Sequence, residues 1–482
     1  MLFNSIDFAI FLPIVFILYW FVTQKNLKFQ NALIVLASYV FYGWWDWRFL
    51  SLIIFSTLVD YTIGQRLRNE EQQSKRKVLL WTSIIVNLGF LGFFKYYNFF
   101  LENFIDAFSL FGMQINTNSL NIILPVGISF YTFQTLSYTI DVYRKKLEPT
   151  QDFIAFSAFV CFFPQLVAGP IERATNLLPQ FYRKRTFEYN KAVDGMRQIL
   201  WGLFKKVVIA DNCAEFANQI FNNSADMNGS TLVLGAIFFT FQIYGDFSGY
   251  SDIAIGTSRL FGFDLKQNFA TPYFSRDIAE FWRRWHISLS TWFRDYLYIP
   301  LGGSRGGTWM KVRNTFAIFL VSGFWHGANW TFIIWGALNA VYFLPLLLSN
   351  NNRKNLGVVA EGKLLPSFRE FFAMLTTFML TVFAWIFFRA ENVSHAFSYI
   401  EGIFSDTILN LPKISGVRNA LGIIFFIILF VIVEWFGRKD EFAIESILLK
   451  IKKPFRWFLY ILIVCLIIIH SGSKQEFIYF QF

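Results

Sequence analysis

The feature that most constrains this chain is its succession of long apolar runs separated by short polar loops. A membrane-spanning helix needs about 20 mostly apolar residues, and runs of that kind recur along the whole sequence. Hydrophobic residues make up 55% of the 482 residues and charged residues only 16%, which is a smaller charged share than soluble domains carry. We therefore expect an all-α, polytopic membrane protein that forms a single integral membrane domain over residues 1–482.

The apolar runs predict about ten to twelve passes of the bilayer. Several runs contain Pro or Gly or are too long for one pass, so we expect some broken or re-entrant helices. The first run has no basic start and no small-residue cleavage site, which favours a retained first span. The candidate spans centre on residues 5–22, 31–45, 49–63, 79–100, 121–140, 153–169, 193–210, 231–261, 314–348, 370–388, 417–436 and 457–470.

The basic residues predict the orientation of these spans. The formal net charge is +11, and the Lys and Arg residues gather in loops between apolar runs. We expect the basic segments 65–77, 144–146 and 266–313 on the cytoplasmic side, whereas 101–119 and 213–230 contain no Lys or Arg and are expected outside. Because the charges are spread over many short loops, the pattern argues against a nucleic-acid partner.

Residues 314–348 form an apolar run with basic segments on both sides. If both flanks are cytoplasmic, the run must dip in and return or cross twice with short arms. Its middle, SGFWHGANW, would then lie inside the membrane or near its outer half. His326 stands in this stretch, and an ionisable residue at such a depth is unfavourable unless it has a function or a specific partner.

Two interpretations of the residues around His326 remain open. On one helix, Gly323 and Gly327 would leave a slot for a substrate beside the imidazole, and Asn329 would share its face and bond the ring. Alternatively, Gly323 and Gly327 form a GxxxG helix contact and His326 bonds a backbone carbonyl.

A second candidate region, DIAEFWRRWHISLSTWFRDYLYIPLGGSRGG (277–307), is basic and aromatic. We expect a short amphipathic helix along the cytoplasmic interface that carries Arg283, Arg284 and Arg294 together with Trp285, close to His286. Arg binds phosphate oxygens in a bidentate way and Trp can stack on adenine, which favours a mouth for an anionic cofactor. An ordinary interfacial anchor is the alternative.

Asp246 and Asp252 lie within an apolar run of QIYGDFSGYSDIAIG (242–256). Carboxylates at that depth need a partner, a proton or a cavity, and a structural ion pair, for instance with Arg259, is the simplest explanation. The three cysteines, Cys161, Cys213 and Cys465, have no metal-like spacing. We therefore predict no disulfide framework and no metal site.

Several of these stretches, in this order, resemble the membrane-bound O-acyltransferase family, and within it the bacterial alginate O-acetylation subgroup. The resemblance runs from residue 125 to the last residue, and the WRRWH and WHGANW pair is its most specific part. The matching stretches are PVGISFYTFQTLSYTIDVYR, FPQLVAGPIERA, QIYGDFSGYSDIAIG, FWRRWHISLSTWFRDYLYIPLGGSR, FWHGANWTFIIWG and FIYFQF.

The resemblance implies a ring of tilted transmembrane helices around a thinner wall that a tunnel pierces. Acetyl-coenzyme A (acetyl-CoA) would arrive from the cytoplasm as acyl donor, and an acceptor hydroxyl from outside. The family's essential histidine matches His326 and its second histidine matches His286. The resemblance also implies a bacterial inner membrane location and a periplasmic or surface SGNH-hydrolase-like partner that modifies an exopolysaccharide.

On this view His326 is the candidate general base, since imidazole titrates near neutral pH. Asn329 would orient the ring or the substrate, and Arg283, Arg284 and Arg294 would hold the cofactor phosphates. A covalent acetyl-imidazole remains an alternative.

Three rival functions stay open. Asp246 and Asp252 also suit an ion-coupled transporter or flippase. A scaffold that recruits an outer enzyme would not need His326. Within the family, D-alanyl transfer to teichoic acid is the third.

Overall fold

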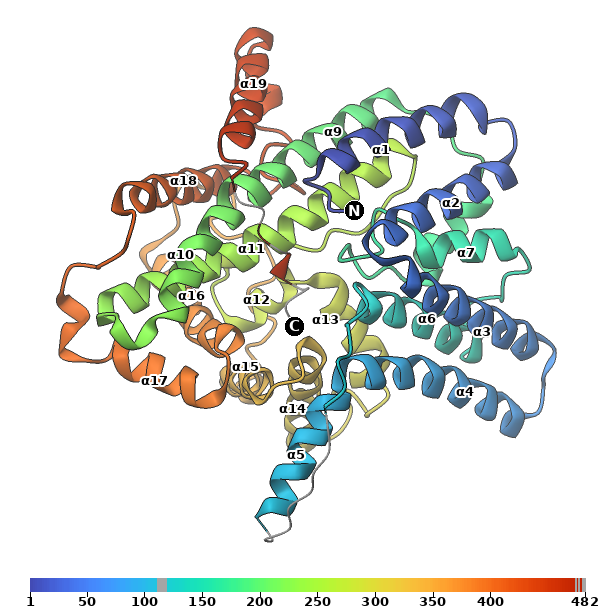
Figure 1. Cartoon of the computed structure of the whole chain (residues 1–482), viewed down its shortest axis with the longest axis horizontal. Helices are drawn as coiled ribbons and strands as arrows, with labels where there is room; N and C mark the ends of the chain where they lie inside the picture. Colours follow the sequence, from blue (N-terminus) through green and yellow to red (C-terminus); the bar gives the residue numbers. More distant parts are fainter. Residues whose placement is uncertain (111–118, 473–474, 476, 479–482) are drawn as a thin grey trace. The chain divides into compact units, whose positions relative to one another are not determined.

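The computed structural model describes residues 1–110, 119–472, 475 and 477–478, and over these ranges it contains helices and loops but no β-strand (Figure 1). The all-α prediction is confirmed. The chain forms two compact units: Met1–Ala192 with Thr257–Lys266 is unit 1, and Val193–Gly256 with Gln267–Phe482 is unit 2. The expectation of one integral membrane domain over residues 1–482 stays a prediction.

Unit 1 contains the N-terminal helices. Its order is α1 (Ile6–Ile17), α2 (Leu27–Asp46), α3 (Leu50–Asn69), α4 (Gln73–Leu91), α5 (Tyr97–Ser109), α6 (Ile128–Tyr143), α7 (Phe153–Cys161) and α8 (Ala174–Leu177).

The segment Thr257–Lys266 returns from later in the chain and packs into unit 1. The hydroxyl of Tyr19 donates to the carbonyl of Phe261 at 3.0 Å, and the indole N–H of Trp20 donates to Leu260 at 2.9 Å. At the other end of this segment, the backbone N–H of Lys266 donates to the Glu172 carboxylate at 2.6 Å. These contacts complete the core of unit 1 with residues distant in sequence.

Unit 2 holds the remaining helices and all the candidate site residues. It comprises most of α9 (Tyr189–Leu203) and α11 (Gly229–Leu260), with α10 (Asp211–Asn222), α12 (Ile278–Arg284), α13 (Ile287–Phe293), α14 (Thr308–His326), α15 (Trp330–Leu348), α16 (Phe368–Arg389), α17 (Val393–Ile403), α18 (Val417–Phe436) and α19 (Lys453–Ile469).

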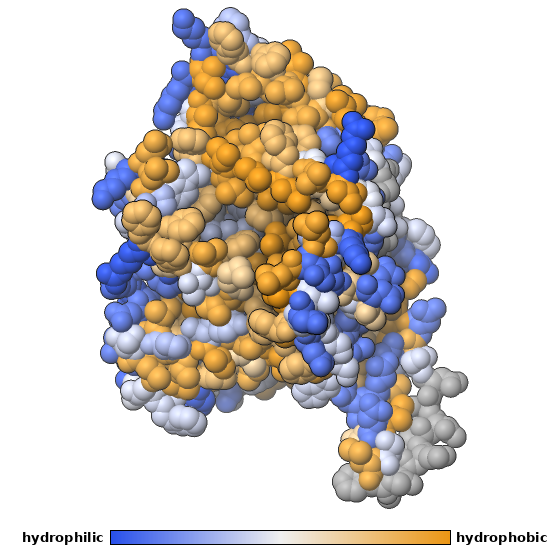
Figure 2. Space-filling model, turned by 90° about the vertical axis from the view of Figure 1, so that its left-hand side faces the viewer, coloured by the Kyte–Doolittle hydropathy of each residue, from blue (hydrophilic) through white to orange (hydrophobic). Residues whose placement is uncertain are grey.

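Long apolar helices give the chain its membrane character. Within the described residues, five are long and apolar enough to cross a bilayer: Gln73–Ser109, Gly229–Leu260, Trp330–Leu348, Phe368–Arg389 and Val417–Phe436; the shorter Ile6–Val22 is also apolar. Figure 2 shows one face of the molecule, on which apolar side chains predominate. On α18, for example, Leu421 and Phe425 are each 61% exposed. Such side chains are stable in contact with lipid, so the chain is a multi-pass membrane protein.

Two segments expected outside are more regular than loops. Residues 213–230 lie largely in α10 and the start of α11, and residues 101–109 belong to α5. The remainder of the first segment includes residues 111–118, which are outside the described residues. Both helices carry apolar side chains at helical spacing.

The apolar run 314–348 forms a helical hairpin, as the basic segments on both sides of it predicted. Helices α14 and α15 are antiparallel neighbours joined by a short turn at Gly327–Asn329. Their close approach depends on glycine. A Cβ at Gly323 would lie 2.2 Å from the Phe332 carbonyl oxygen, and one at Gly336 would lie 2.3 Å from that of Phe319. The interpretation of Gly323 as a helix-contact residue is therefore confirmed.

The Gly323→Ala variant should unfold at a lower temperature, because the added methyl group has to push α14 and α15 apart, at a cost of about 1–3 kcal/mol. Gly422→Ala in α18 is the matched control, since nothing lies within 4 Å of its added Cβ. Intrinsic tryptophan fluorescence during heating of the detergent-solubilised protein measures both. Equal midpoints for the two variants would contradict glycine-dependent packing of this hairpin.

Candidate active site

His326 is the last residue of α14 and lies in an aromatic cage. Its ring centroid is 4.8 Å from that of Trp325, 5.1 Å from Trp335 and 5.3 Å from Phe388. The side chains come from α14, α15 and α16, and His326 is 4% exposed. The imidazole is therefore held in water-poor surroundings, where its interactions with a reacting group are strengthened.

Asn329 does not occupy the position expected from helical spacing. Because α14 ends at His326, Asn329 instead caps α15: its side-chain oxygen accepts the Thr331 N–H at 3.0 Å, and its amide group donates to the Glu391 carbonyl at 2.7 Å. The prediction of a shared helical face is wrong. Asn329 fixes the turn that follows His326 and ties it to the end of α16.

The expected slot beside the imidazole is also filled. A Cβ at Gly327 would lie 2.0 Å from the Phe332 ring, and the space next to Gly323 holds the Phe332 backbone. These glycines admit Phe332 rather than a substrate, so the slot prediction is wrong for these two positions.

His286 lies at the break between α12 and α13 and is 1% exposed. Its Nδ1 is 3.1 Å from Oδ1 of Asn268, and its ring packs edge-on against Phe247 at 4.6 Å. Burial lowers the pKa of His286 to about 3, so the ring is uncharged at neutral pH. Its centroid is 6.2 Å from that of Trp325, and Trp325 therefore contacts both histidines.

The helix predicted along the interface is instead part of the protein core. It breaks at His286, whose φ is 44°, and the α12 side chains pack inward. Trp285 is 2% exposed, and its ring lies 5.6 Å from Phe281 and 5.1 Å from Trp385. The prediction of a single interfacial helix is wrong, because its aromatic side chains find partners on α16 rather than in lipid headgroups.

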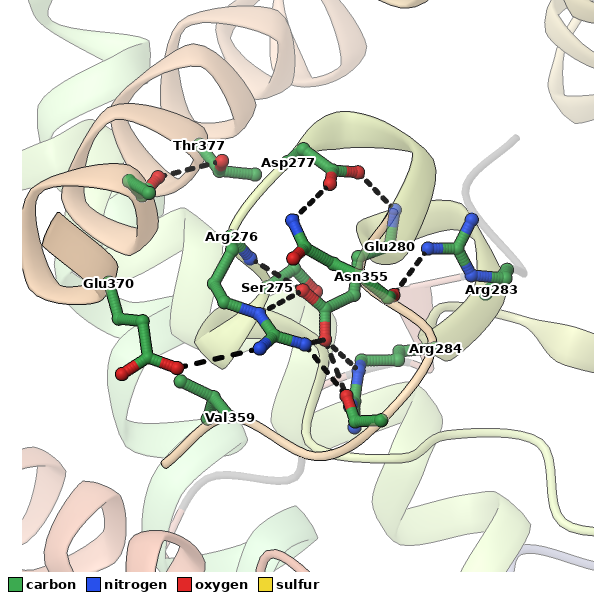
Figure 3. A network of polar contacts seen from close by, with 12 residues as sticks. Ser275, Arg276, Asp277, Glu280, Arg283, Arg284, Asn355, Val359, Glu370 and Thr377 are labelled. Carbon is green, nitrogen blue, oxygen red and sulfur yellow. Dashed lines mark hydrogen bonds and ion pairs between the residues drawn. The ribbon is translucent and has the colours of Figure 1, made fainter. Parts of the chain in front are cut away.

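The arginines of α12 hold the segment after α15 (Figure 3). Arg283 donates to the carbonyls of Asn352 and Asn355 at 2.8 and 2.7 Å. Arg284 donates to Gly357 at 3.2 Å and pairs with Glu280 at 3.0 Å, at the i,i+4 spacing that favours an ion pair on a helix. We call residues 352–357 the strap.

Arg276 adds a third cationic contact to the strap. It pairs with Glu280 at 3.0 Å and donates to the Gly357 carbonyl at 2.7 Å. Arg294 is not part of this group: it lies in the π-helical turn after α13, pairs with Asp295 at 2.7 Å and has a side chain that is 60% exposed. The structure thus brings Arg283 and Arg284 together and leaves Arg294 apart.

Asp246 and Asp252 on α11 pair with two lysines that the sequence reasoning missed. Lys206 Nζ lies 2.7 Å from both Asp246 and Asp211, and Lys205 Nζ lies 2.5 Å from Asp252. The lysines belong to the π-helical turn Phe204–Ala210. The prediction of a structural ion pair is confirmed, although the cations are Lys205 and Lys206 rather than Arg259. The sequence FKK (204–206) places these two lysines within the apolar run 193–210, which could have indicated that they pair with buried carboxylates.

Residues 477–478, near the C-terminus, pack beside the charge pairs of α11. The backbone N–H of Ile478 donates to Asp246 Oδ2 at 2.7 Å. The Phe477 ring lies 5.1 Å from Tyr250 and 6.4 Å from Phe247, which contacts His286. Asp246 thus links the charge pairs of α11 to the chain end and to the neighbourhood of the second histidine.

Comparison with known proteins identifies the family of this chain. Residues 147–356, which contain both histidines, match the sequence profile of the membrane-bound O-acyltransferase family. The chain is 40% identical to a probable alginate O-acetylase, AlgI, of Pseudomonas aeruginosa over 91% of its length and 82% of that protein. The chain belongs to the membrane-bound O-acyltransferase family and is an O-acyltransferase.

Two further relatives have different acceptors or acyl groups in their names. The chain is 36% identical to a peptidoglycan O-acetyltransferase of Helicobacter pylori, over 84% of this chain and 80% of that protein. It is 27% identical to a teichoic acid D-alanyltransferase of Bacillus subtilis, over 57% of this chain and 71% of that protein.

The Lys206→Ala variant should be strongly destabilised, because it leaves Asp211 and Asp246 buried without their cation, at a cost of about 3–5 kcal/mol. The matched control is Lys191→Ala: the Lys191 side chain is 46% exposed, and an exposed ion pair contributes about 0–1 kcal/mol. Thermal unfolding in detergent compares the two. A Lys206→Ala midpoint as high as that of Lys191→Ala would show that this ion pair is dispensable.

Proposed function

We propose that the protein transfers an acetyl group from cytoplasmic acetyl-CoA to hydroxyl groups of an extracellular or periplasmic polysaccharide. It would act in the bacterial inner (cytoplasmic) membrane and pass the acetyl group on through a periplasmic or surface SGNH-hydrolase-like partner. The relatives named for O-acetylation support this proposal, since they are 40% and 36% identical and cover most of the chain. An alginate-like exopolysaccharide or a cell-wall glycan is the proposed acceptor.

The observation that carries the proposal is the meeting of two histidines on one tryptophan. His286 and His326 come from different helices, yet their rings lie 6.2 and 4.8 Å from Trp325. Two buried imidazoles in one aromatic cage are an unfavourable arrangement for packing alone, because each ring nitrogen must be satisfied in apolar surroundings. An acyl-transfer centre gives both rings a use.

In the proposed mechanism His326 is the general base. It takes the proton of the acceptor hydroxyl as that oxygen attacks the thioester carbonyl carbon. The carbon–sulfur bond breaks and the leaving thiolate receives the proton from the imidazolium, so the reaction needs no net proton. His286 stays neutral at physiological pH, since its pKa is about 3. It therefore positions the thioester or shapes the passage rather than binding phosphate.

Arg283 and Arg284 would act on the donor side. Both guanidinium groups are engaged with the strap or with Glu280, so we propose that they hold the strap in place while part of their positive charge faces the donor phosphates. Arg294, which is exposed, and Trp285, which is buried, remain proposed donor contacts of the same region. Asp246 and Asp252 support the site through their lysine pairs.

D-alanyl transfer to teichoic acid is the second candidate. The 27% identity to the Bacillus subtilis D-alanyltransferase favours it, although that match covers only 57% of this chain. Mass spectrometry of surface glycans separates the two, because acetyl and D-alanyl esters differ in mass.

The His326→Ala variant should abolish polysaccharide acetylation while the protein still accumulates in the membrane, because it removes the group proposed to take the hydroxyl proton. Acetyl content of surface glycans, measured by mass spectrometry in cells carrying each variant, is the readout. His470→Ala, at the end of α19, is the matched histidine control and should acetylate normally. Normal acetylation by His326→Ala would remove His326 as the base.

The double variant Arg283→Ala, Arg284→Ala should raise the KM for acetyl-CoA by about tenfold, equivalent to the loss of one charge-assisted contact. Arg418→Ala, an exposed arginine at the start of α18, controls for loss of positive charge. Acetyl transfer by the purified protein at varied acetyl-CoA provides KM and kcat. An unchanged KM would assign both arginines to the strap alone.

A further inference from the structure

Three helices of unit 1 each direct a pair of polar side chains, four residues apart, at one buried point. Residues at i and i+4 share a helix face, so each pair forms two levels of the same cluster. The members are Ser56 and Asp60 on α3, Ser83 and Asn87 on α4, and Thr135 and Thr139 on α6, and each is at most 1% exposed. We call these six residues the Asp60 cluster.

The lower level surrounds the Asp60 carboxylate with donors. Ser83 Oγ donates to Oδ1 at 2.5 Å and Thr139 Oγ1 donates to the same oxygen at 3.1 Å. Asn87 Nδ2 donates to Oδ2 at 2.9 Å. The three donors stabilise the ionised carboxylate, whereas burial disfavours that form unless a positive charge lies nearby.

The upper level is organised around the Asn87 side-chain oxygen. It accepts from Ser56 Oγ at 2.8 Å and from Thr135 Oγ1 at 3.2 Å. Seven side-chain oxygens from three helices therefore lie in one chain of contacts. Such a concentration of oxygen atoms is uncommon among apolar helices, where each polar group is costly to bury.

The negative charge of Asp60 has no protein counter-charge. Among the described residues, no Lys, Arg or His side chain lies within ion-pairing distance of its carboxylate, and its hydrogen bonds come from hydroxyl and amide groups. In unit 2, by contrast, Asp246 and Asp252 each meet a lysine. An ionised carboxylate fully removed from water needs a compensating positive charge.

We propose that the Asp60 cluster binds an alkali metal cation, with sodium as the preferred ion. One carboxylate with hydroxyl and amide oxygens is a hard, all-oxygen set of low total charge, which suits a monovalent cation better than zinc or another transition metal. To bind the ion, a hydroxyl group must direct its single proton elsewhere. Thr135 Oγ1 has the Thr132 carbonyl 3.2 Å away as an alternative acceptor to the Asn87 side-chain oxygen. The ion would join α3, α4 and α6.

This inference is independent of the proposed acetyl transfer, since the Asp60 cluster lies in unit 1 and both histidines lie in unit 2. Its test uses the purified full-length protein in detergent, with tryptophan fluorescence during heating as the readout. Sodium chloride replaces N-methylglucamine chloride stepwise at constant ionic strength and pH, and potassium chloride forms a parallel series. A ligand that binds only the folded state raises the unfolding temperature as its concentration rises.

The wild-type protein should show a saturable rise in unfolding temperature with sodium, and Asp60→Asn should lose that rise. Thr82→Val, one residue from Ser83 but exposed, is the matched control and should keep it. If Asp60→Asn fails to accumulate, Ser83→Ala and Thr139→Val serve instead and should raise the midpoint sodium concentration by about tenfold, since each removes one ligand.

Two outcomes would overturn the proposal. A wild-type unfolding temperature independent of sodium and potassium, with Asp60→Asn equally stable, would identify a neutral carboxylic acid that binds a proton instead. A sodium response shared equally by wild type, Asp60→Asn and Thr82→Val would be a general salt effect.

Discussion

The pairing of buried charges between the π-helical turn Phe204–Ala210 and α11 is the interaction on which the site in unit 2 depends. Lys206 lies between Asp211 and Asp246, and Lys205 meets Asp252. These contacts fix α11 against α9 and α10 where no water can screen or replace them. Asp246 then holds the Ile478 backbone, and the neighbouring Phe247 packs against His286. The ion pair of Asp246 thus helps to fix the position of His286, which packs against the adjacent residue, Phe247.

Aromatic packing connects the surroundings of His286 with those of His326. Trp325 contacts both histidines, and Trp335 stacks on Trp385 at 5.6 Å, next to the rings that enclose His326. Rings of this size have few rotatable bonds, so a cage made from them holds an imidazole with little loss of side-chain entropy. The glycines of α14 and α15 let the two backbones come close enough for these rings to meet.

Much of this arrangement could be predicted from the sequence, because it follows from the apolar composition of the runs and from the basic residues that flank them. The apolar runs predicted the helices, the basic flanks of 314–348 required a hairpin, and an imidazole inside that run marked His326. What the sequence did not reveal was where helices stop. Helical spacing placed Asn329 beside His326 and Arg294 beside Arg284, but α14 ends at His326 and α12 ends at Arg284. Helix ends depend on tertiary contacts, such as the bond from Asn329 to Glu391, that no local pattern contains.

His286 has a strained backbone conformation. Its φ of 44° places an L-residue in the left-handed region, at a cost of about 1–2 kcal/mol that glycine would avoid. The chain carries an imidazole rather than a glycine at this corner between two short helices, so the side chain of His286 is kept there at the cost of conformational strain.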